Sequence, residues 1–314
     1  MSLKVLVTCP PMLRQIDSFR EVFAGLDIEI TTPDVVQVLT VEQLFELVPQ
    51  HDGWIIGDDP ATAEVFEAGV AGRLRAAVKW GIGVDNVDFS ACERLGIPIT
   101  NTPGMFGAEV ADLAMCYVLG LARDAFLIDR EIRQGSWPKP AGISTAGKTM
   151  GIIGLGDIGR NIAKRAQAHD MAVIGWDPYT KEIPDYIALQ EQWPTNIERC
   201  DFLVFACALT EENHHLFDET ILGLVKKGVR LVNVSRGPLI SETALLKGLA
   251  DKTIKSAALD VFEIEPLSPS NQILDYPQCI LGSHNGSNTI DAVIRASQQA
   301  ISLLAKMLQK ETVL

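Results

Sequence analysis

The sequence has too few basic residues to balance its acidic ones. Its 314 residues hold 27 Lys and Arg against 40 Asp and Glu, which gives a formal net charge of −13. Nucleic-acid backbones and anionic membranes attract basic surfaces, so this deficit argues against either as the main partner. It also means that an anionic substrate needs a local cluster of positive charge or of hydrogen-bond donors.

Closely spaced cysteines are missing as well. The six cysteines form no Cys-x-x-Cys pair and have no zinc-finger spacing: Cys9, Cys92, Cys116, Cys200, Cys207 and Cys279. We expect no metal site and buried, reduced thiols in a cytoplasmic protein. The first apolar run ends at Pro10 and Pro11, which makes it too short for the apolar region of a signal peptide.

No apolar run is both long and uninterrupted. The most apolar stretch, residues 110–128, contains Asp112, Arg123 and Asp124, and is therefore predicted to be one core helix rather than a membrane span. Repeats, low-complexity tracts and long structureless linkers are also missing. At roughly 150 residues per domain, the length predicts about two domains, each with its own core.

Short apolar runs alternate with helical patterns along nearly the whole chain. A first series of runs lies at residues 4–8, 28–31, 54–56 and 76–80. After a breaker cluster at 101–104 and a loop at 135–140, a second series lies at 150–154, 172–176, 202–207, 230–234, 257–261 and 279–282. A final helix is predicted over 289–310. This alternation is typical of βαβ units and predicts an α/β fold with two doubly wound parallel sheets.

A glycine fingerprint opens the second series. Gly154-x-Gly156-x-x-Gly159 follows an apolar strand and begins a helical pattern, as in sites where a cofactor diphosphate lies at a helix N-terminus. A glycine triplet alone also suits an ordinary turn. Asp177, however, ends the next predicted strand 18 residues after Gly159, near the expected spacing of about 20. Its carboxylate can accept hydrogen bonds from both ribose hydroxyls. No cation stands directly beside it, so NAD is favoured over NADP.

Three charged residues follow predicted strands of the second series. Hydride transfer to a carbonyl needs an acid/base and a cation that holds the substrate. Of the five histidines, His284 is best placed, since it follows a strand at the carboxyl edge where open α/β sheets bind ligands. Arg236 offers a fork for a carboxylate, and Glu265 can orient the histidine and favour its protonated form. A structural histidine, a surface arginine and a solvated acidic loop are the alternatives at these three positions.

Ordered motifs over nearly the whole chain resemble the D-isomer-specific 2-hydroxyacid dehydrogenase family, most closely its phosphoglycerate dehydrogenase-like members. The motifs lie at residues 79–86, 96–103, 147–154, 232–237 and 258–266. The resemblance implies an NAD-binding Rossmann domain, residues 103–287, inserted in a flavodoxin-like substrate domain, residues 1–102 and 288–314. It also implies hinges near Pro103 and Ser287 and a homodimer formed through the long helix of the cofactor domain.

The family activity is the interconversion of a D-2-hydroxy acid and its 2-oxo acid, with phosphoglycerate, hydroxypyruvate and glyoxylate as candidate substrates. One alternative is an NAD-sensing binding protein of the corepressor type without significant turnover. A formate or phosphite dehydrogenase of the same fold is a weaker alternative.

The resemblance also implies roles for individual residues. Arg236, Glu265 and His284 match the catalytic residues, and Ile82, Gly83 and Val84 join Arg236 in holding the substrate. Asp260 matches the contact with the nicotinamide amide. The full set matched to the cofactor is Gly154, Gly156, Asp157, Ile158, Gly159, Asp177, Cys207, Ala208, Val234, Ser235, Arg236, Asp260, His284 and Gly286.

The chain departs from the family pattern in three places. Ser283 and Asn285 replace apolar neighbours of the histidine. The loop that begins at Ala208 lacks the usual proline and carries Asn213 in place of threonine. After the third strand, where phosphoglycerate-using members tend to carry arginine, the chain has Asp58 and Asp59. We expect two carboxylates there to repel a phosphate, which makes 3-phosphoglycerate a doubtful substrate.

Overall fold

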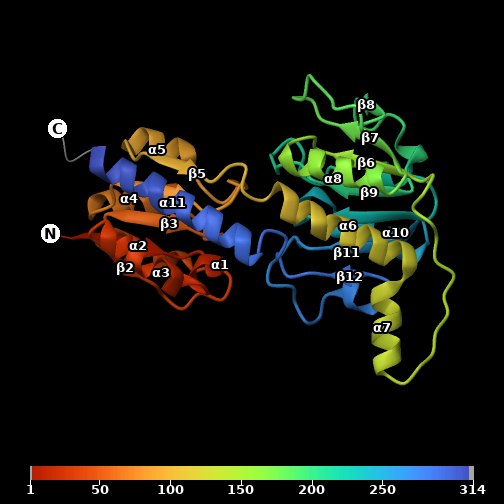
Figure 1. Cartoon of the computed structure of the whole chain (residues 1–314), viewed down its shortest axis with the longest axis horizontal. Helices are drawn as coiled ribbons and strands as arrows, with labels where there is room; N and C mark the ends of the chain where they lie inside the picture. The colour runs from red at the N-terminus through yellow and green to blue at the C-terminus, as the bar shows by residue number, and fades with distance from the viewer. Residues whose placement is uncertain (1, 311–314) are drawn as a thin grey trace. The chain divides into compact units, whose positions relative to one another are not determined.

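The computed structural model describes residues 2–310. Met1 and residues 311–314, which the predicted first domain includes, lie outside the described part. The chain forms two compact units. One holds the residues up to Met105 together with those from Asn288 onward, and the other holds Phe106–Ser287. Each unit contains one parallel sheet with helices packed on it (Figure 1).

The first unit has a five-stranded sheet in the order β2-β1-β3-β4-β5, with every neighbouring pair parallel. Its strands are β1 (Leu3–Val7), β2 (Ile28–Thr31), β3 (Gly53–Ile56), β4 (Ala76–Lys79) and β5 (Ile99–Asn101). The strand order reverses between β1 and β3, so their carboxyl ends form a topological switch point, where ligands bind in doubly wound sheets. The short strand β5 was not predicted, because it spans three half-buried residues beside the breaker cluster.

Helices from both ends of the chain cover the first sheet. They are α1 (Pro10–Leu13), α2 (Arg20–Gly25), α3 (Val41–Leu47), α4 (Ala63–Ala71), α5 (Phe89–Leu95) and α11 (Ile290–Lys310), with 3₁₀ turns η1 (Ile16–Phe19) and η2 (Val48–Gln50). The last helix, α11, lies against β3 and β4 (Figure 1, blue). Trp80 Nε1 donates a hydrogen bond to Ser297 Oγ at 3.1 Å, which joins this helix to the end of β4.

The second unit has a seven-stranded parallel sheet in the order β12-β11-β10-β9-β6-β7-β8. Its strands are β6 (Thr149–Ile153), β7 (Ala172–Trp176), β8 (Leu189–Glu191), β9 (Phe202–Phe205), β10 (Val229–Asn233), β11 (Ile254–Leu259) and β12 (Ile280–Leu281). The central strands are almost wholly buried, which explains why they read as continuous apolar runs. The two parallel sheets confirm the predicted fold class.

The helices of the second unit correct one prediction. They are α6 (Gly107–Arg123), α7 (Ala125–Arg133), α8 (Asp157–Ala168), α9 (Glu219–Leu222) and α10 (Glu242–Ala250), with 3₁₀ turns η3 (Ile197–Arg199), η4 (Gly237–Leu239) and η5 (Gln272–Asp275). The single helix predicted over 110–128 was wrong. Asp124 adopts the left-handed conformation (φ 52°), and its N–H bonds to the Gly120 carbonyl, which ends α6 before α7 begins. Among residues 2–310, no helix is long and apolar enough to cross a membrane.

Candidate active site and cofactor site

Two glycines of the fingerprint, which lies between β6 and α8, leave no room for a Cβ. Gly154 has a positive φ of 95°, and an added Cβ there would lie 2.6 Å from Cys207 Cα. An added Cβ at Gly159 would lie 1.9 Å from the Gly154 carbonyl oxygen, so helix and loop touch at this point. A Cβ at Gly156, in contrast, would meet nothing within 4 Å. The loop therefore leaves open space at the position where a diphosphate approaches the backbone in this motif.

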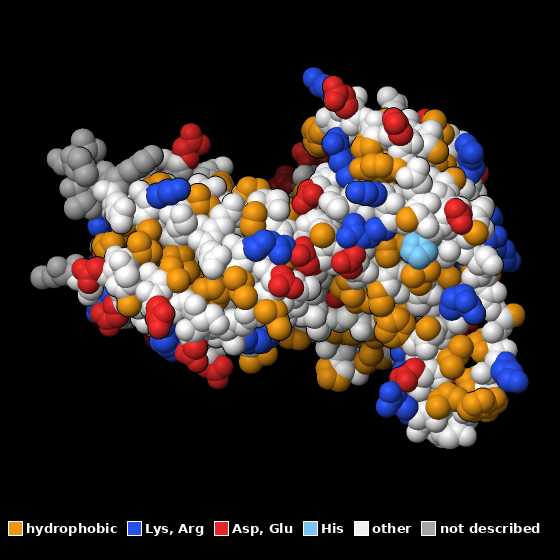
Figure 2. Space-filling model, in the orientation of Figure 1, with side chains coloured by type: hydrophobic (Ala, Val, Ile, Leu, Met, Phe, Trp, Pro, Cys, Tyr) orange, Lys and Arg blue, Asp and Glu red, His pale blue; other side chains and the backbone are white. Residues whose placement is uncertain are grey.

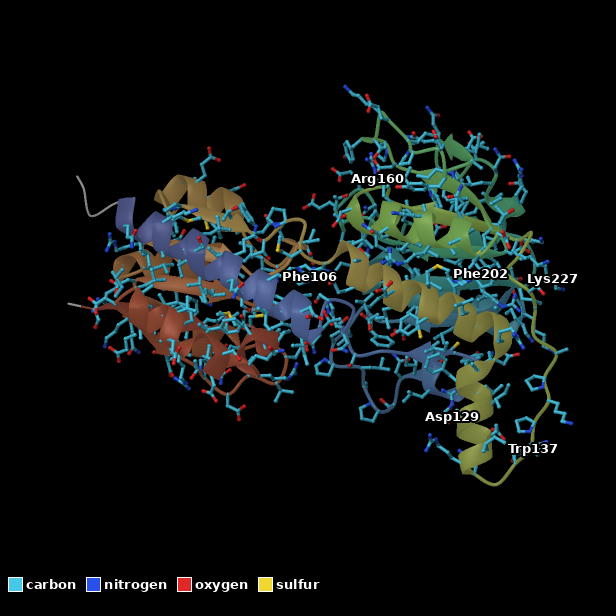
Figure 3. The ribbon with its side chains drawn as sticks, viewed as in Figure 1. Phe106, Asp129, Trp137, Arg160, Phe202 and Lys227 are labelled. Atoms are coloured by element: carbon cyan, nitrogen blue, oxygen red, sulfur yellow. The ribbon has the colours of Figure 1, made fainter. Side chains whose placement is uncertain are left out.

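The N-terminus of α8 provides hydrogen-bond donors for an anion. Gly156 is the N-cap and provides no side chain to occupy the free N–H groups of the first turn. The helix dipole favours negative charge at the same place. Arg160, near the start of α8 (Figure 3), donates to the carbonyls of Leu155 and Glu182 at 2.9 and 3.0 Å. This arginine braces the fingerprint loop. The residues present therefore fit the diphosphate of NAD.

Asp177 connects the end of β7 to the fingerprint loop. Its Oδ2 accepts a hydrogen bond from Leu155 N at 2.7 Å, and its Oδ1 accepts from Tyr179 N and Thr180 N at 2.8 and 3.0 Å. The side chain is partly exposed. Each carboxylate oxygen has more than one acceptor direction, so these bonds orient the group and leave room for ribose hydroxyls. Sequence spacing had predicted the position of this carboxylate but not its three backbone bonds.

The loops after β9 and β10 are tied together beside the fingerprint. The Ser235 hydroxyl donates to the Cys207 carbonyl. Asn213 Nδ2 donates to the Ala208 carbonyl, and its Oδ1 accepts from Thr210 N, both at 2.7 Å. Asn213 therefore closes this loop where the family has a different residue. Burial raises the pKa of the Cys207 thiol to about 11, which keeps it protonated and unreactive at neutral pH.

Arg236 lies on a loop that is shaped by a buried asparagine. Asn233, at the end of β10 and 1% exposed, donates from Nδ2 to the Arg236 carbonyl at 2.8 Å and accepts from Ser235 N at 3.1 Å. The half-buried guanidinium donates to the Ser235 carbonyl at 2.9 Å. An added Cβ at Gly237 would lie 1.9 Å from the Phe262 carbonyl carbon. The Arg236 loop thus packs directly on the segment that leads to Glu265.

His284 and Glu265 form a hydrogen-bonded pair. His284 Nδ1 lies 2.7 Å from Glu265 Oε2, and the other carboxylate oxygen accepts from Phe262 N at 2.9 Å. The two side chains are 23% and 21% exposed, so the pair is partly desolvated but accessible. Because a carboxylate only accepts, we assign the hydrogen of a neutral imidazole to Nδ1. This leaves Nε2 as the atom that can exchange a proton with a ligand.

The turn that carries His284 is held by Asp260. The Asp260 carbonyl accepts from His284 N at 2.6 Å, and its Oδ2 accepts from Gly286 N at 2.8 Å. Asp260 is 2% exposed, and its Oδ1 lies 3.3 Å from the Tyr117 hydroxyl. Burial and the neighbouring carboxylate raise the pKa of Tyr117, so it stays a neutral donor. His284 itself has a positive φ of 53°, which these contacts stabilise.

The predicted site residues fall in both units. Those matched to the cofactor and to the chemistry lie in the second unit, around the loops that follow its strands. Ile82, Gly83 and Val84 lie in the first unit, on the loop after β4. Gly81 N donates to Thr102 Oγ1 at 2.8 Å, and Asn101 Nδ2 donates to the Ile82 carbonyl at 3.1 Å. Ile82 and Val84 are exposed.

Three residues that shape the site were not among those predicted. Asn233 has a visible signal, since it is a polar residue that ends an apolar strand. Gly237 lies in the motif at 232–237, but the motif does not show its contact with Phe262. Tyr117 has no sequence signal, because its contact with Asp260 joins residues that are distant in sequence.

The expectation that Asp58 and Asp59 present two carboxylates at the end of β3 was wrong. Asp59 is fully buried. Its oxygens accept from Leu39 N at 2.9 Å, from Gly57 N at 3.2 Å and from the Thr8 hydroxyl, and burial raises its pKa. Asp58 is paired with Lys79 at 2.9 Å. Within residues 2–310, no group of three or more His, Cys, Asp or Glu side chains is arranged to hold a metal ion.

The chain is similar to known proteins in sequence and in fold. The sequence model of the D-isomer specific 2-hydroxyacid dehydrogenase, NAD binding domain, matches residues 115–286, more than half of the chain. This match confirms NAD as the cofactor. A D-3-phosphoglycerate dehydrogenase of Methanocaldococcus jannaschii is 34% identical over 289 residues, which cover 90% of this chain and 55% of that protein. The chain thus spans only about half the length of this relative.

Two other similar proteins match at nearly full length. A hydroxypyruvate reductase of Thermotoga maritima is 32% identical over 292 residues, which cover 90% of this chain and 92% of that protein. The crystal structure of a glyoxylate reductase from Paecilomyes thermophila matches with a TM-score of 0.84 and 25% identity, over 99% of this chain and 96% of that one.

Proposed function

The chain belongs to the D-isomer specific 2-hydroxyacid dehydrogenase family, and from this premise we propose that it interconverts a short D-2-hydroxy acid and its 2-oxo acid with NAD. The observation that carries the proposal is the partly exposed His284–Glu265 pair, at 2.7 Å, in the same unit as the fingerprint loop. Reduction of a carbonyl generates an alkoxide that must be protonated, and an imidazole oriented by a carboxylate can provide that proton. Bound NAD supplies or accepts the hydride.

Arg236 is proposed to hold the substrate. Its guanidinium can bind a carboxylate or a polarised carbonyl with two parallel hydrogen bonds. The Asn233 side chain fixes the backbone at Ser235 N and at the Arg236 carbonyl, which limits the entropy lost when substrate is bound. Backbone N–H groups of Ile82, Gly83 and Val84 are proposed as further donors to the substrate carboxylate.

His284 is proposed to move the proton. In the direction of reduction, the protonated imidazole donates from Nε2 to the developing alkoxide, and the Glu265 carboxylate stabilises the imidazolium. In the direction of oxidation, the neutral imidazole accepts the hydroxyl proton. The two directions therefore have opposite pH dependence. Asp177 is proposed to bind the adenosine ribose, where its negative charge disfavours a 2′-phosphate.

The proposed substrates are unphosphorylated acids such as glyoxylate and hydroxypyruvate. Similar proteins include a glyoxylate reductase and a hydroxypyruvate reductase that match at nearly full length, whereas the chain spans 55% of the phosphoglycerate dehydrogenase. The paired state of Asp58 and Lys79 also supports a substrate without a phosphate.

We also propose that the protein is a cytoplasmic homodimer that uses the second unit as its interface. Helix α7 has no buried residue within the chain, and Phe126, Ile132 and Trp137 are exposed on or next to it. Trp137 lies on the segment that follows α7 (Figure 3). Hydrophobic side chains gather on the face where α6 and α7 lie (Figure 2). An apolar surface of this kind is typical of protein–protein interfaces.

A substrate panel tests the proposed activity. The purified chain is mixed with NADH and, in separate reactions, with glyoxylate, hydroxypyruvate, 3-phosphohydroxypyruvate and longer 2-oxo acids, and the loss of NADH absorbance is followed. We expect turnover with at least one short acid and much slower turnover with NADPH. Tight NADH binding without turnover on any acid would contradict the proposal and would favour the sensor alternative.

A further inference from the structure

A buried lysine lies at the carboxyl edge of the sheet in the first unit. Lys79 is the last residue of β4, and its side chain is 3% exposed. Its Nζ donates to Asp58 Oδ1 at 2.9 Å and to the Trp80 carbonyl at 3.1 Å. Asp58 follows β3 and is 38% exposed. The pair therefore has an ammonium group inside the protein and a carboxylate that reaches solvent.

This pair occupies the place where the first sheet is built to bind a ligand. Asp58 follows β3, which forms the topological switch point together with β1. The two strand ends are in close contact there, since an added Cβ at Gly57 would lie 2.9 Å from Cys9 Cα. Lys79 Nζ lies 3.6 Å from the position of an added Cβ at Gly81. The ammonium group thus adjoins the loop that contains Ile82, Gly83 and Val84.

We propose that Asp58 and Lys79 form a specificity-determining pair. The Asp58 carboxylate occupies the position beside Lys79 that would otherwise be taken by an anionic group on the substrate's tail, the end of the molecule away from its carboxylate and carbonyl. The inference rests on the proposed function, because the loop at 81–84 is taken to hold the substrate carboxylate. A buried ammonium needs a counter-ion, and Asp58 supplies it from within the chain. An uncharged tail meets no penalty from this arrangement. A phosphate or second carboxylate on the tail meets a cation whose charge is already neutralised.

The pair also determines which uncharged tails fit. The exposed part of Asp58 is a carboxylate, which accepts hydrogen bonds and donates none. It favours a tail with a hydroxyl group over a purely apolar tail of the same size. The substrate class that follows is an unphosphorylated 2-oxo acid with a hydroxyl on its tail, of which hydroxypyruvate is the simplest.

The test compares two acids that differ only by a phosphate, hydroxypyruvate and 3-phosphohydroxypyruvate, at one fixed pH. The variants are Asp58→Asn and Asp58→Asn combined with Lys79→Met. Asp17→Asn is the matched control, because it also removes an aspartate paired with a cation, but on the surface, 2.7 Å from Arg20. Asp58→Ser replaces Asp58→Asn if the latter does not fold, as judged by its melting curve.

We expect wild type to prefer hydroxypyruvate. Asp58→Asn should shift the ratio of kcat/KM toward the phosphorylated acid by about 10-fold to 100-fold, the value of one charge-assisted hydrogen bond. The double variant should return to the wild-type ratio, because Lys79 is gone, and Asp17→Asn should not change it. An unchanged ratio in folded Asp58→Asn, or a wild type that prefers the phosphorylated acid, overturns the proposal.

A second readout separates this inference from the proposed activity. Inorganic phosphate should raise the melting temperature of Asp58→Asn but not that of wild type, of the double variant or of Asp17→Asn. If no acid is turned over by any of these proteins, the proposed function fails. The effect of phosphate on the melting temperature then still tests the proposed role of Asp58 and Lys79. If phosphate changes the melting temperature of wild type and of Asp58→Asn equally, the proposed role of the pair is contradicted, even when turnover is normal.

Discussion

His284 Nδ1 and Glu265 Oε2 lie 2.7 Å apart, although the two residues are 19 positions apart in sequence and follow different strands. The contact arises because β11 and β12 are parallel neighbours, so the segments after them leave the same edge of the sheet. The His284 backbone is fixed by the Asp260 carbonyl, and the Glu265 carboxylate is fixed by Phe262 N. Both partners are therefore oriented before any substrate arrives.

Replacing either member of this pair should impair proton transfer. His284→Ala should lower kcat by about 10²-fold to 10⁴-fold, the usual contribution of a general acid. Glu265→Gln removes the charge that stabilises the imidazolium, so the decline of reduction with rising pH should begin at lower pH. Rates across pH, with NADH binding measured by fluorescence, provide the check. Near-normal turnover in His284→Ala would exclude the role of His284.

Arg236→Lys should keep the positive charge but lose the planar guanidinium group with its paired N–H donors. A lysine cannot form two parallel hydrogen bonds to a carboxylate, so kcat/KM should fall by about 10-fold to 100-fold, with KM raised and kcat lowered together. Steady-state kinetics with hydroxypyruvate measure both values. Arg199→Lys, on the 3₁₀ turn η3, is the matched control and should leave them unchanged. Wild-type kinetics in Arg236→Lys would indicate an arginine outside the substrate site.

Asp177→Ser should relax the preference for NAD. The substitution removes the charge that disfavours a 2′-phosphate and weakens the ribose contact, so the ratio of kcat/KM for NADH over NADPH should fall by about 10-fold or more. It also removes acceptors for Leu155 N, Tyr179 N and Thr180 N, so the melting temperature should decrease. An unchanged cofactor ratio in a folded variant would contradict the ribose role.

Gly237→Ala should separate the Arg236 loop from the segment before Glu265. An added Cβ would lie 1.9 Å from the Phe262 carbonyl carbon and 2.4 Å from Glu263 N, so the backbone must move. Overpacking of this kind costs about 1–3 kcal/mol of folding stability. We expect a lower free energy of unfolding in urea and a loss of kcat/KM. Gly25→Ala, where an added Cβ meets nothing within 4 Å, is the control and should change neither.

The proposed homodimer predicts a mass of about twice the 34.2 kDa of one chain by light scattering. Phe126→Glu places a charge on the apolar surface of α7 and should shift the protein toward monomer. Val36→Glu, which places the same charge at an exposed apolar position in the first unit, should remain dimeric. A monomeric wild type would contradict the proposed interface.

Much of this protein follows from sequence patterns alone. The alternation of apolar runs with helical periods predicted two parallel sheets, because strands buried on both faces must be apolar throughout. The glycine fingerprint followed by Asp177 predicted NAD, and the ordered motifs predicted the family. All of these predictions were confirmed. They succeeded because each depends on residues that are close in sequence or on a spacing that the backbone itself imposes.

Other features could not be predicted from these patterns. The left-handed conformation of Asp124 divides a helix that its sequence presents as continuous. Asp58 and Asp59 are adjacent in sequence and equally charged, yet one is paired with Lys79 and the other is buried among backbone donors. Only the three-dimensional fold decided which carboxylate reaches solvent, because the free energy of a charge depends on the groups that surround it. The overall deficit of positive charge is thus determined by the sequence. Packing determines which of the acidic side chains are paired, which are buried and which reach solvent.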